Sequence, residues 1–178
     1  MKKPIILWAA LSILPFFSGQ ALEKVKDFSF NDIEGKSHNF SDYQGKWVLV
    51  NYWATYCPPC HAEIPDIERF AQDNKDDFIV LGMDAGGSQI NEILSFKEQL
   101  NISYDLIPIQ QSTMLSFGTI IGIPTSYIVN PKGEIVDKYV GIITYDDLDF
   151  HINPPIYKSA SADKKTIEQS FDSSTPNQ

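Results

Sequence analysis

The sequence predicts a single α/β domain in which a central mixed β-sheet is flanked by helices. Two near-continuous apolar runs, residues 47–53 and 78–83, are typical of strands buried on both faces of a sheet, and a segment of helical periodicity follows each. Two later apolar segments are joined by the turn sequence Asn-Pro-Lys-Gly at 130–133, which indicates a hairpin at the sheet edge. A chain of 178 residues with 43% hydrophobic content has room for one ordinary core.

The first 21 residues have the pattern of a secretory signal sequence. Two lysines precede an apolar run over residues 4–17, and small or polar residues follow up to Ala21. The run is shorter than the ~20 residues that a membrane-spanning helix needs, and Pro15 interrupts it. We therefore predict a periplasmic or otherwise exported protein that is soluble after cleavage near Ala21. An uncleaved N-terminal membrane anchor is the alternative.

The segment after the leader predicts a hairpin, a central strand and a helix, in that order along the chain. Residues 28–30 alternate apolar and polar side chains and run into a turn-rich segment at 31–36, which suggests a hairpin. Residues 41–46 are typical of a short turn, and the apolar run 47–53 then predicts the central strand. Apolar residues recur at helical spacing behind it, so residues 58–74 are predicted to form one amphipathic helix.

The second half repeats the alternation of strand and helix. Residues 78–83 predict a second buried strand, after which Ser88 is expected to cap a helix. The apolar stripe of that helix comprises Ile90, Ile93, Leu94 and Leu100. The remaining predicted elements are a strand at 104–107, a short helix at 114–117, hairpin strands at 126–129 and 135–140, and a short helix at 145–150.

Beyond residue 153 the composition changes. Two prolines and many polar residues replace the apolar periodicity, so residues 154–178 are predicted to be a mostly disordered tail. The folded domain is expected to span residues 22–153. The balance of 14 basic against 23 acidic residues gives a net charge of -9, which disfavours nucleic acid as a partner.

Cys57 and Cys60 are the only two cysteines. A bond between cysteines three residues apart closes a very small loop and stabilises a fold weakly, so a redox role is favoured over a structural one. Because proline disfavours helical dihedrals in the residue before it, Cys57 should cap the helix, with Pro58 at its first position. A thiol at a helix N-terminus ionises more readily, which makes Cys57 the predicted nucleophile and Cys60 the buried, resolving thiol.

The cysteines lie within a longer block that carries a resemblance. Residues 51–65, Asn-Tyr-Trp-Ala-Thr-Tyr-Cys-Pro-Pro-Cys-His-Ala-Glu-Ile-Pro, resemble the active-site block of the TlpA/ResA/CcmG family of exported thioredoxin-like proteins. Residues 28–46 resemble the N-terminal hairpin of that family, and residues 122–129 its proline loop and following strand. The resemblance implies a thioredoxin-like fold with an N-terminal β-hairpin extension, and thiol-disulfide exchange as the activity.

The same resemblance implies roles for single residues. Pro124 is the cis-proline across from the cysteines, and the backbone of Ile123 pairs with an extended substrate segment. Thioredoxins proper keep an aspartate beneath the cysteines, where this chain has Asn51, so Glu63 is the expected acid-base group. An exposed acid that merely suits the helix dipole is the alternative for Glu63.

Three residues next to the sulfurs are expected to contact the substrate together with Ile123. Tyr56 stands where the family usually has tryptophan, which bears on partner fit and redox potential. Pro58 and Pro59 lack an N–H group and stiffen the loop, so a thiolate at Cys57 can accept backbone hydrogen bonds only from Cys60 onward.

Two other readings of the motif stay open at this point. Cys57 to His61 fits the C-x-x-C-H pattern of covalent c-type haem attachment, although the surrounding strand and helix alternation favours the redox fold. Alternatively, both thiolates could bind copper with a histidine in a copper chaperone. The candidate histidines are His38, His61 and His151. We predict no resident metal or cofactor, and a solvated His61 beside the active site.

The resemblance also suggests a cellular role. It implies a reductant that serves cytochrome c maturation or copper-centre assembly, acts on protein dithiols and disulfides, and is resupplied by a membrane thiol donor such as a DsbD/CcdA-like protein. A general disulfide oxidant in protein folding is the alternative. No dimerisation segment is evident in the sequence, so the expected state is a monomer.

Overall fold

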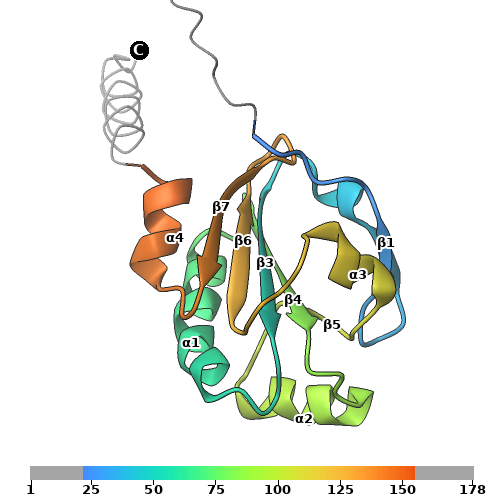
Figure 1. Ribbon diagram of the computed structural model, residues 1–178. Helices are drawn as coiled ribbons and strands as arrows, with labels where there is room; N and C mark the ends of the chain where they lie inside the picture. The colour runs from blue at the N-terminus through green and yellow to red at the C-terminus, as the bar shows by residue number, and fades with distance from the viewer. Residues whose placement is uncertain (1–21, 155–178) are drawn as a thin grey trace, which may run out of the picture.

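The computed structural model describes residues 22–154, which form a central five-stranded sheet, four α-helices and a separate two-stranded hairpin (Figure 1). The strands are β1 Ser29–Asn31, β2 Ser37–Asn39, β3 Trp47–Trp53, β4 Phe78–Asp84, β5 Asp105–Ile107, β6 Thr125–Val129 and β7 Ile135–Val140. The helices are the 3-10 turn η1 Phe40–Tyr43, α1 Pro58–Asp73, α2 Ile90–Gln99, α3 Gln111–Ser116 and α4 Tyr145–Ile152. The predicted leader, and the predicted tail from residue 155 onward, lie outside the described residues.

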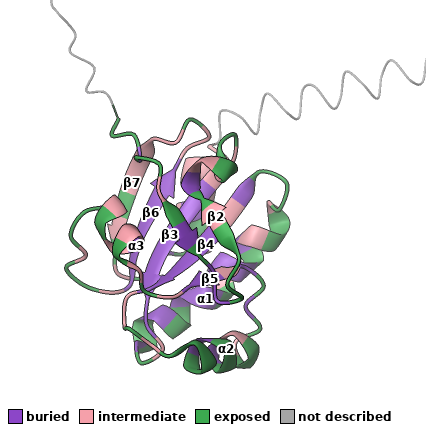
Figure 2. Cartoon of the chain, turned by 90° about the vertical axis from the view of Figure 1, so that its right-hand side faces the viewer, coloured by how far each residue is buried: buried purple, intermediate pink, exposed green. Residues whose placement is uncertain are grey.

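The central sheet has the strand order β5-β4-β3-β6-β7 and is mixed, as predicted. Strands β3, β4 and β5 are parallel, whereas β6 and β7 run antiparallel to their neighbours. Strand β3 lies in the middle, and six of its seven residues are buried because helices or loops cover both faces (Figure 2). The apolar run 47–53 therefore forms the centre of the sheet for the physical reason that predicted it.

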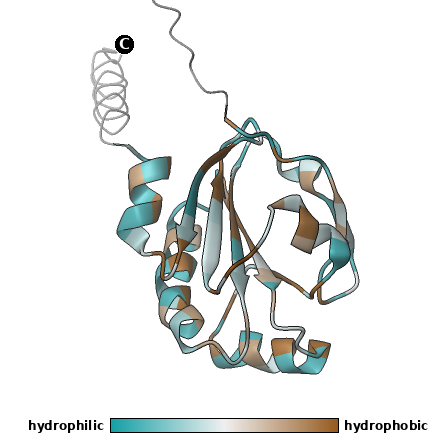
Figure 3. Cartoon of the chain, in the orientation of Figure 1, coloured by the Kyte–Doolittle hydropathy of each residue, from teal (hydrophilic) through white to brown (hydrophobic). Residues whose placement is uncertain are grey.

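Alternate residues of β3 belong to two hydrophobic cores. Leu49 and Trp53 face the core that α1, α2 and α4 cover. Val48, Val50 and Tyr52 face the core beneath the hairpin and α3. Figure 3 shows strongly hydrophobic residues in the sheet and in α3. Among residues 22–154, no helix is both long and apolar enough to cross a bilayer.

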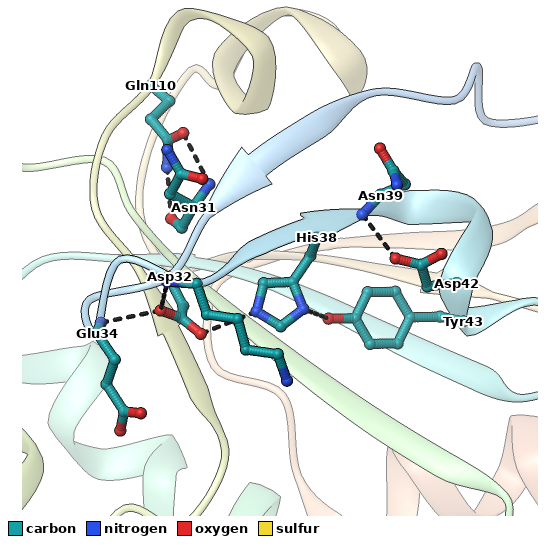
Figure 4. Close-up of polar contacts among 9 residues, drawn as sticks. Asn31, Asp32, Glu34, His38, Asn39, Asp42, Tyr43 and Gln110 are labelled. Carbon is teal, nitrogen blue, oxygen red and sulfur yellow. Dashed lines mark hydrogen bonds and ion pairs between the residues drawn. The ribbon is translucent and has the colours of Figure 1, made fainter.

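The hairpin of β1 and β2 packs beside α3 and is tied by a polar cluster (Figure 4). The Asp32 side chain accepts hydrogen bonds from the backbone N–H groups of Glu34 and Lys36, each at 2.9 Å, and so closes the turn. Its other oxygen lies 2.8 Å from the ring of His38, which in turn meets the Tyr43 hydroxyl at 3.1 Å. The predicted hairpin is confirmed, and this network holds its tip.

The structure corrects the prediction for helix α2. The helix begins at Ile90 with Gln89 as its N-cap, and the backbone N–H of Gln89 donates to the Glu92 side chain at 2.7 Å. Ser88 as the cap was therefore wrong, because its hydroxyl bonds Asp84 instead. The predicted stripe is also wrong in part: the buried residues of the helix are Ile93 and Phe96, whereas Ile90 and Leu94 are exposed.

Smaller differences concern the ends of other elements. The predicted turn at 41–46 is the 3-10 turn η1, which starts at Phe40. Helix α3 begins three residues before the predicted 114–117, and α4 extends two residues past the predicted end at residue 150. None of these shifts changes which strands pair.

Candidate active site

The cysteines lie where the central strand passes into helix α1, at the carboxyl ends of the parallel strands (Figure 1). Strand β3 ends at Trp53, which pairs with Asp84, the last residue of β4. A tight turn follows, closed by a hydrogen bond of 3.1 Å from the Cys57 N–H to the Ala54 carbonyl. Cys57 then serves as the N-cap of α1, with Pro58 at the first helical position, and both predictions are confirmed.

Cys57 and Cys60 form a disulfide, so the structure represents the oxidised protein. The Cys60 N–H donates to the sulfur of Cys57 at 3.3 Å, which is the first backbone donor available beyond the two prolines. Cys57 is 5% exposed and Cys60 is fully buried. Cys57 is therefore the more accessible residue of the pair.

Glu63 is buried in helix α1, one helical turn beyond Cys60. Its two oxygens accept hydrogen bonds from the Asn51 side chain at 2.7 Å and from the Ile143 N–H at 3.0 Å. Asn51 also donates to the Ser126 hydroxyl at 3.0 Å. Burial raises the pKa of Glu63 to about 7, against the opposing effect of both hydrogen bonds. The carboxyl can therefore bind and release a proton near neutral pH.

Pro124 follows a cis peptide bond from Ile123, in agreement with the prediction. Strand β6 begins at the next residue, and Thr125 pairs with Tyr52 in the antiparallel register. Pro124 therefore directly precedes the strand that pairs with the end of β3. The Pro124 carbonyl accepts from the Gly141 N–H at 2.9 Å, which ties this loop to the end of β7.

The surface around the sulfurs is apolar and exposed. Tyr56 is 69% exposed, and Pro58 and Pro59 are exposed beside it, whereas Ile123 is half-buried. Three further exposed apolar residues were not predicted from the sequence: Ile121 and Ile142 in loops, and Val140 at the end of β7. The sequence contains a signal for this apolar surface. Residues 106–126 and 139–144 have no charged side chain, although the chain as a whole is strongly acidic.

The structure changes the interpretation of His61. The residue is exposed, but its Nε2 donates to the Thr55 carbonyl at 2.8 Å and its ring meets that of Phe96 edge-on at 4.9 Å. It is therefore bonded to the active-site turn rather than simply solvated. His38 and His151 lie in two other clusters, beside Asp32 and Asp137. Within residues 22–154 no three or more His, Cys, Asp or Glu side chains are grouped as a metal site would require.

The fold and the linked cysteines define a class: a thioredoxin-like thiol-disulfide oxidoreductase, with a mixed sheet, a disulfide at a helix N-terminus and a cis-proline just before the strand that pairs with β3. The model of the AhpC/TSA family matches residues 21–138, and the chain belongs to that family. The resemblance inferred from the active-site block is thereby confirmed.

The names of two relatives agree with this class. The thiol-disulfide oxidoreductase ResA of Geobacillus thermodenitrificans is 28% identical over 127 residues, which covers 71% of this chain and 72% of ResA. The thioredoxin-like protein YneN of Bacillus subtilis is 27% identical over 129 residues, covering 71% of this chain and 75% of YneN.

Solved structures show the same fold. A thiol:disulfide interchange protein of the thioredoxin family from Chlorobium tepidum has a TM-score of 0.67 at 26% identity, covering 79% of this chain and 97% of that protein. A DsbF homologue from Corynebacterium diphtheriae has a TM-score of 0.69 at 20% identity, covering 84% and 99%, and supports the fold alone.

Proposed function

We propose that the protein transfers electron pairs between dithiols and disulfides of other proteins, with Cys57 as the attacking sulfur and Cys60 as the resolving one. The observation that carries the proposal is the position of Cys57, which caps helix α1 and accepts the N–H of Cys60. A helix N-terminus favours negative charge, so this position stabilises a thiolate once the disulfide is reduced. The greater exposure of Cys57 supports the same order of roles.

The first step forms a mixed disulfide. The thiolate of Cys57 attacks one sulfur of a partner disulfide, a new S–S bond forms between them, and the second partner sulfur leaves as a thiolate that takes up a proton. In the second step Cys60, as a thiolate, attacks the sulfur of Cys57. The intermolecular bond breaks and the partner leaves as a dithiol. The partner gains two electrons, and the protein ends as the disulfide present in the structure.

Glu63 accepts the proton that Cys60 must lose before the second step. Its pKa of about 7 leaves a useful fraction ionised at neutral pH, and its place one helical turn from Cys60 suits proton transfer, directly or through a water. The hydrogen bonds from Asn51 and Ile143 fix the orientation of its carboxylate. In the reverse direction the same group returns the proton to Cys60.

A partner chain binds in extended form across the exposed apolar surface. The backbone of Ile123 offers hydrogen bonds to it, and Pro124 keeps a competing donor away from the sulfurs. Tyr56, Pro58 and Pro59 contact residues on the other side of the disulfide.

The predicted leader and the family resemblance support a proposal for the cellular role. We place a signal sequence at 1–21, the thioredoxin-like domain at 22–153 and a tail at 154–178, in an exported monomer that acts in the periplasm. There it reduces protein disulfides in cytochrome c maturation or copper-centre assembly. A membrane thiol donor then reduces Cys57 and Cys60 back to the dithiol. Curated relatives named thiol-disulfide oxidoreductases support the reaction class.

Partner trapping tests this function. Without Cys60 the mixed disulfide cannot be resolved, so Cys60→Ser in the full chain should accumulate partner adducts that reducing agent releases. The double variant Cys57→Ser, Cys60→Ser is the control and should carry none. If a folded, exported Cys60→Ser variant holds no partner through Cys57, the proposed mechanism is wrong.

A further inference from the structure

Asp84 is a buried acid at the carboxyl end of β4 that the exchange steps leave unused. It is 1% exposed, and it accepts hydrogen bonds from the N–H groups of Gly86 at 3.1 Å and of Ser88 at 2.7 Å. These bonds hold the loop between β4 and α2. A buried carboxylate is costly unless its partners satisfy it, so this loop geometry depends on Asp84.

A chain of hydroxyl groups links Asp84 to the active-site turn. The Ser88 hydroxyl donates to Asp84 Oδ1 at 3.2 Å and lies 3.1 Å from the hydroxyl of Thr55. Because a serine hydroxyl has a single proton and Asp84 receives it, Thr55 donates to Ser88. Two neutral hydroxyls thus connect the turn to a buried charge, and consecutive hydrogen bonds of this kind strengthen one another.

Thr55 is a central residue of the turn that places the nucleophile. The turn runs from Ala54 to Cys57 and closes with the Cys57 N–H on the Ala54 carbonyl. The side chain of Thr55 is held through Ser88, and its carbonyl is held by Nε2 of His61 in helix α1. The orientation of the turn is therefore fixed from the β4–α2 loop on one side and from the helix on the other.

Gly86 brings the loop into direct contact with the same turn. A Cβ atom at this position would lie 2.7 Å from the Cβ of Ala54 and 2.9 Å from the ring of Tyr56. Both distances are too short for real atoms, so the backbone of the loop packs against the turn without a side chain between them. The loop that Asp84 holds is thus also the packing surface of Ala54 and Tyr56.

We propose that Asp84 is a positioning residue for disulfide exchange: acting through Ser88 and Thr55, it holds the turn that carries Cys57 and thereby sets the rate at which this sulfur attacks a disulfide. The inference rests on the proposed role of Cys57 as nucleophile. Attack on a disulfide requires a defined approach of the sulfur, and small displacements of a reacting atom slow a reaction strongly.

Two neutral substitutions test the link without changing any charge. Thr55→Val and Ser88→Ala each remove the hydrogen bond between the two hydroxyls. Each should slow the reaction of the reduced full-length protein with oxidised glutathione by about fivefold, because one net hydrogen bond corresponds to a change of that size. Since both act on one link, the double variant should be no slower than either single variant. The readout is the rate constant at pH 7, with the thermal unfolding midpoint measured alongside.

Asp84→Asn has a matched control in Asp32→Asn. Asp32 bonds the N–H groups two and four residues ahead, the same pattern as Asp84, but it closes the hairpin turn (Figure 4). Both variants should lower the unfolding midpoint, and only Asp84→Asn should slow the reaction. If Asp84→Asn does not fold, the reaction rates of Thr55→Val and Ser88→Ala still test the proposal.

Rates within twofold of wild type in Thr55→Val and Ser88→Ala, whatever their stability, would overturn the inference, as would additive effects in the double variant. A failure of the proposed function looks different, because the reduced wild-type protein would then not react with oxidised glutathione at all.

Discussion

Glu63 joins three parts of the molecule at one buried carboxyl. It belongs to α1, and it receives one hydrogen bond from Asn51 on β3 and one from Ile143 between β7 and α4. Sequence reasoning identified the residue through the family resemblance, and its burial removes the alternative of an exposed acid that only suits the helix dipole. Its role in proton transfer stays a prediction.

The raised pKa of Glu63 makes stability depend on pH. The unfolded carboxyl releases its proton near its ordinary value of 4.5, whereas the folded one does so at about 7. Between these values the folded state holds more protons, so its stability falls as pH rises, by about 3 kcal/mol from this group. We predict that Glu63→Gln removes this decline, as measured by urea unfolding at a series of pH values.

The unfolding free energy of the variant should vary less between pH 4.5 and 7 than that of the wild-type protein. A decline of equal size in both proteins would show that another group titrates in this range.

Helix α2 shows what sequence periodicity could and could not specify at the scale of elements. Its existence was predictable, but its buried face was not, because Leu94 and Phe96 are both apolar. The structure buries Phe96, whose ring stacks on Trp53 with centroids 4.5 Å apart, and leaves Leu94 41% exposed. The choice depends on the shape of the sheet surface that receives the ring.

This packing predicts that two alanine substitutions in helix α2 lower the free energy of unfolding by different amounts. Phe96→Ala should reduce the free energy of unfolding by about 3–4 kcal/mol, because it leaves a cavity beside Trp53 and removes the contact with His61. Leu94→Ala, the matched control, should cost less than about 1 kcal/mol. Urea unfolding of both variants measures the difference, and equal costs would contradict the observed packing.

The strands and helix α1, which Cys57 caps, were predictable because the local sequence rules agree with the tertiary structure in these elements. The apolar run 47–53 is buried on both faces, and the proline after Cys57 defines the helix start. The resemblance supplied Pro124, whose cis bond no local rule would indicate. The network from Asp84 to Thr55 could not be predicted, because it joins residues that only the pairing of β3 with β4 brings together.

The whole molecule combines a net charge of -9 with an uncharged, apolar surface around the disulfide. Exposed apolar residues also occur elsewhere, as at Leu94 and Phe150, but those around Cys57 surround the reactive disulfide and lie in segments without charged side chains. The charge distribution thereby favours partner segments with apolar side chains next to their cysteines.

A charge placed on this surface should impair protein substrates selectively. Ile142→Glu should slow the reduction of insulin more than about tenfold, because an unpaired charge in an apolar contact costs 1–3 kcal/mol or more, and should leave the reaction with oxidised glutathione within about twofold. The control is Phe150→Glu, which changes an exposed apolar residue on helix α4 and should affect neither rate. Equal slowing of insulin and glutathione by Ile142→Glu would contradict a docking role.

The most direct test of the account is to identify which sulfur reacts first. We predict that iodoacetamide at pH 7 labels Cys57 of the reduced, full-length protein before Cys60, and faster than it labels a cysteine in an unstructured peptide, as peptide mass mapping over time would measure. Labelling of Cys60 first, or of Cys57 no faster than the peptide cysteine, would contradict the assignment of Cys57 as an activated nucleophile.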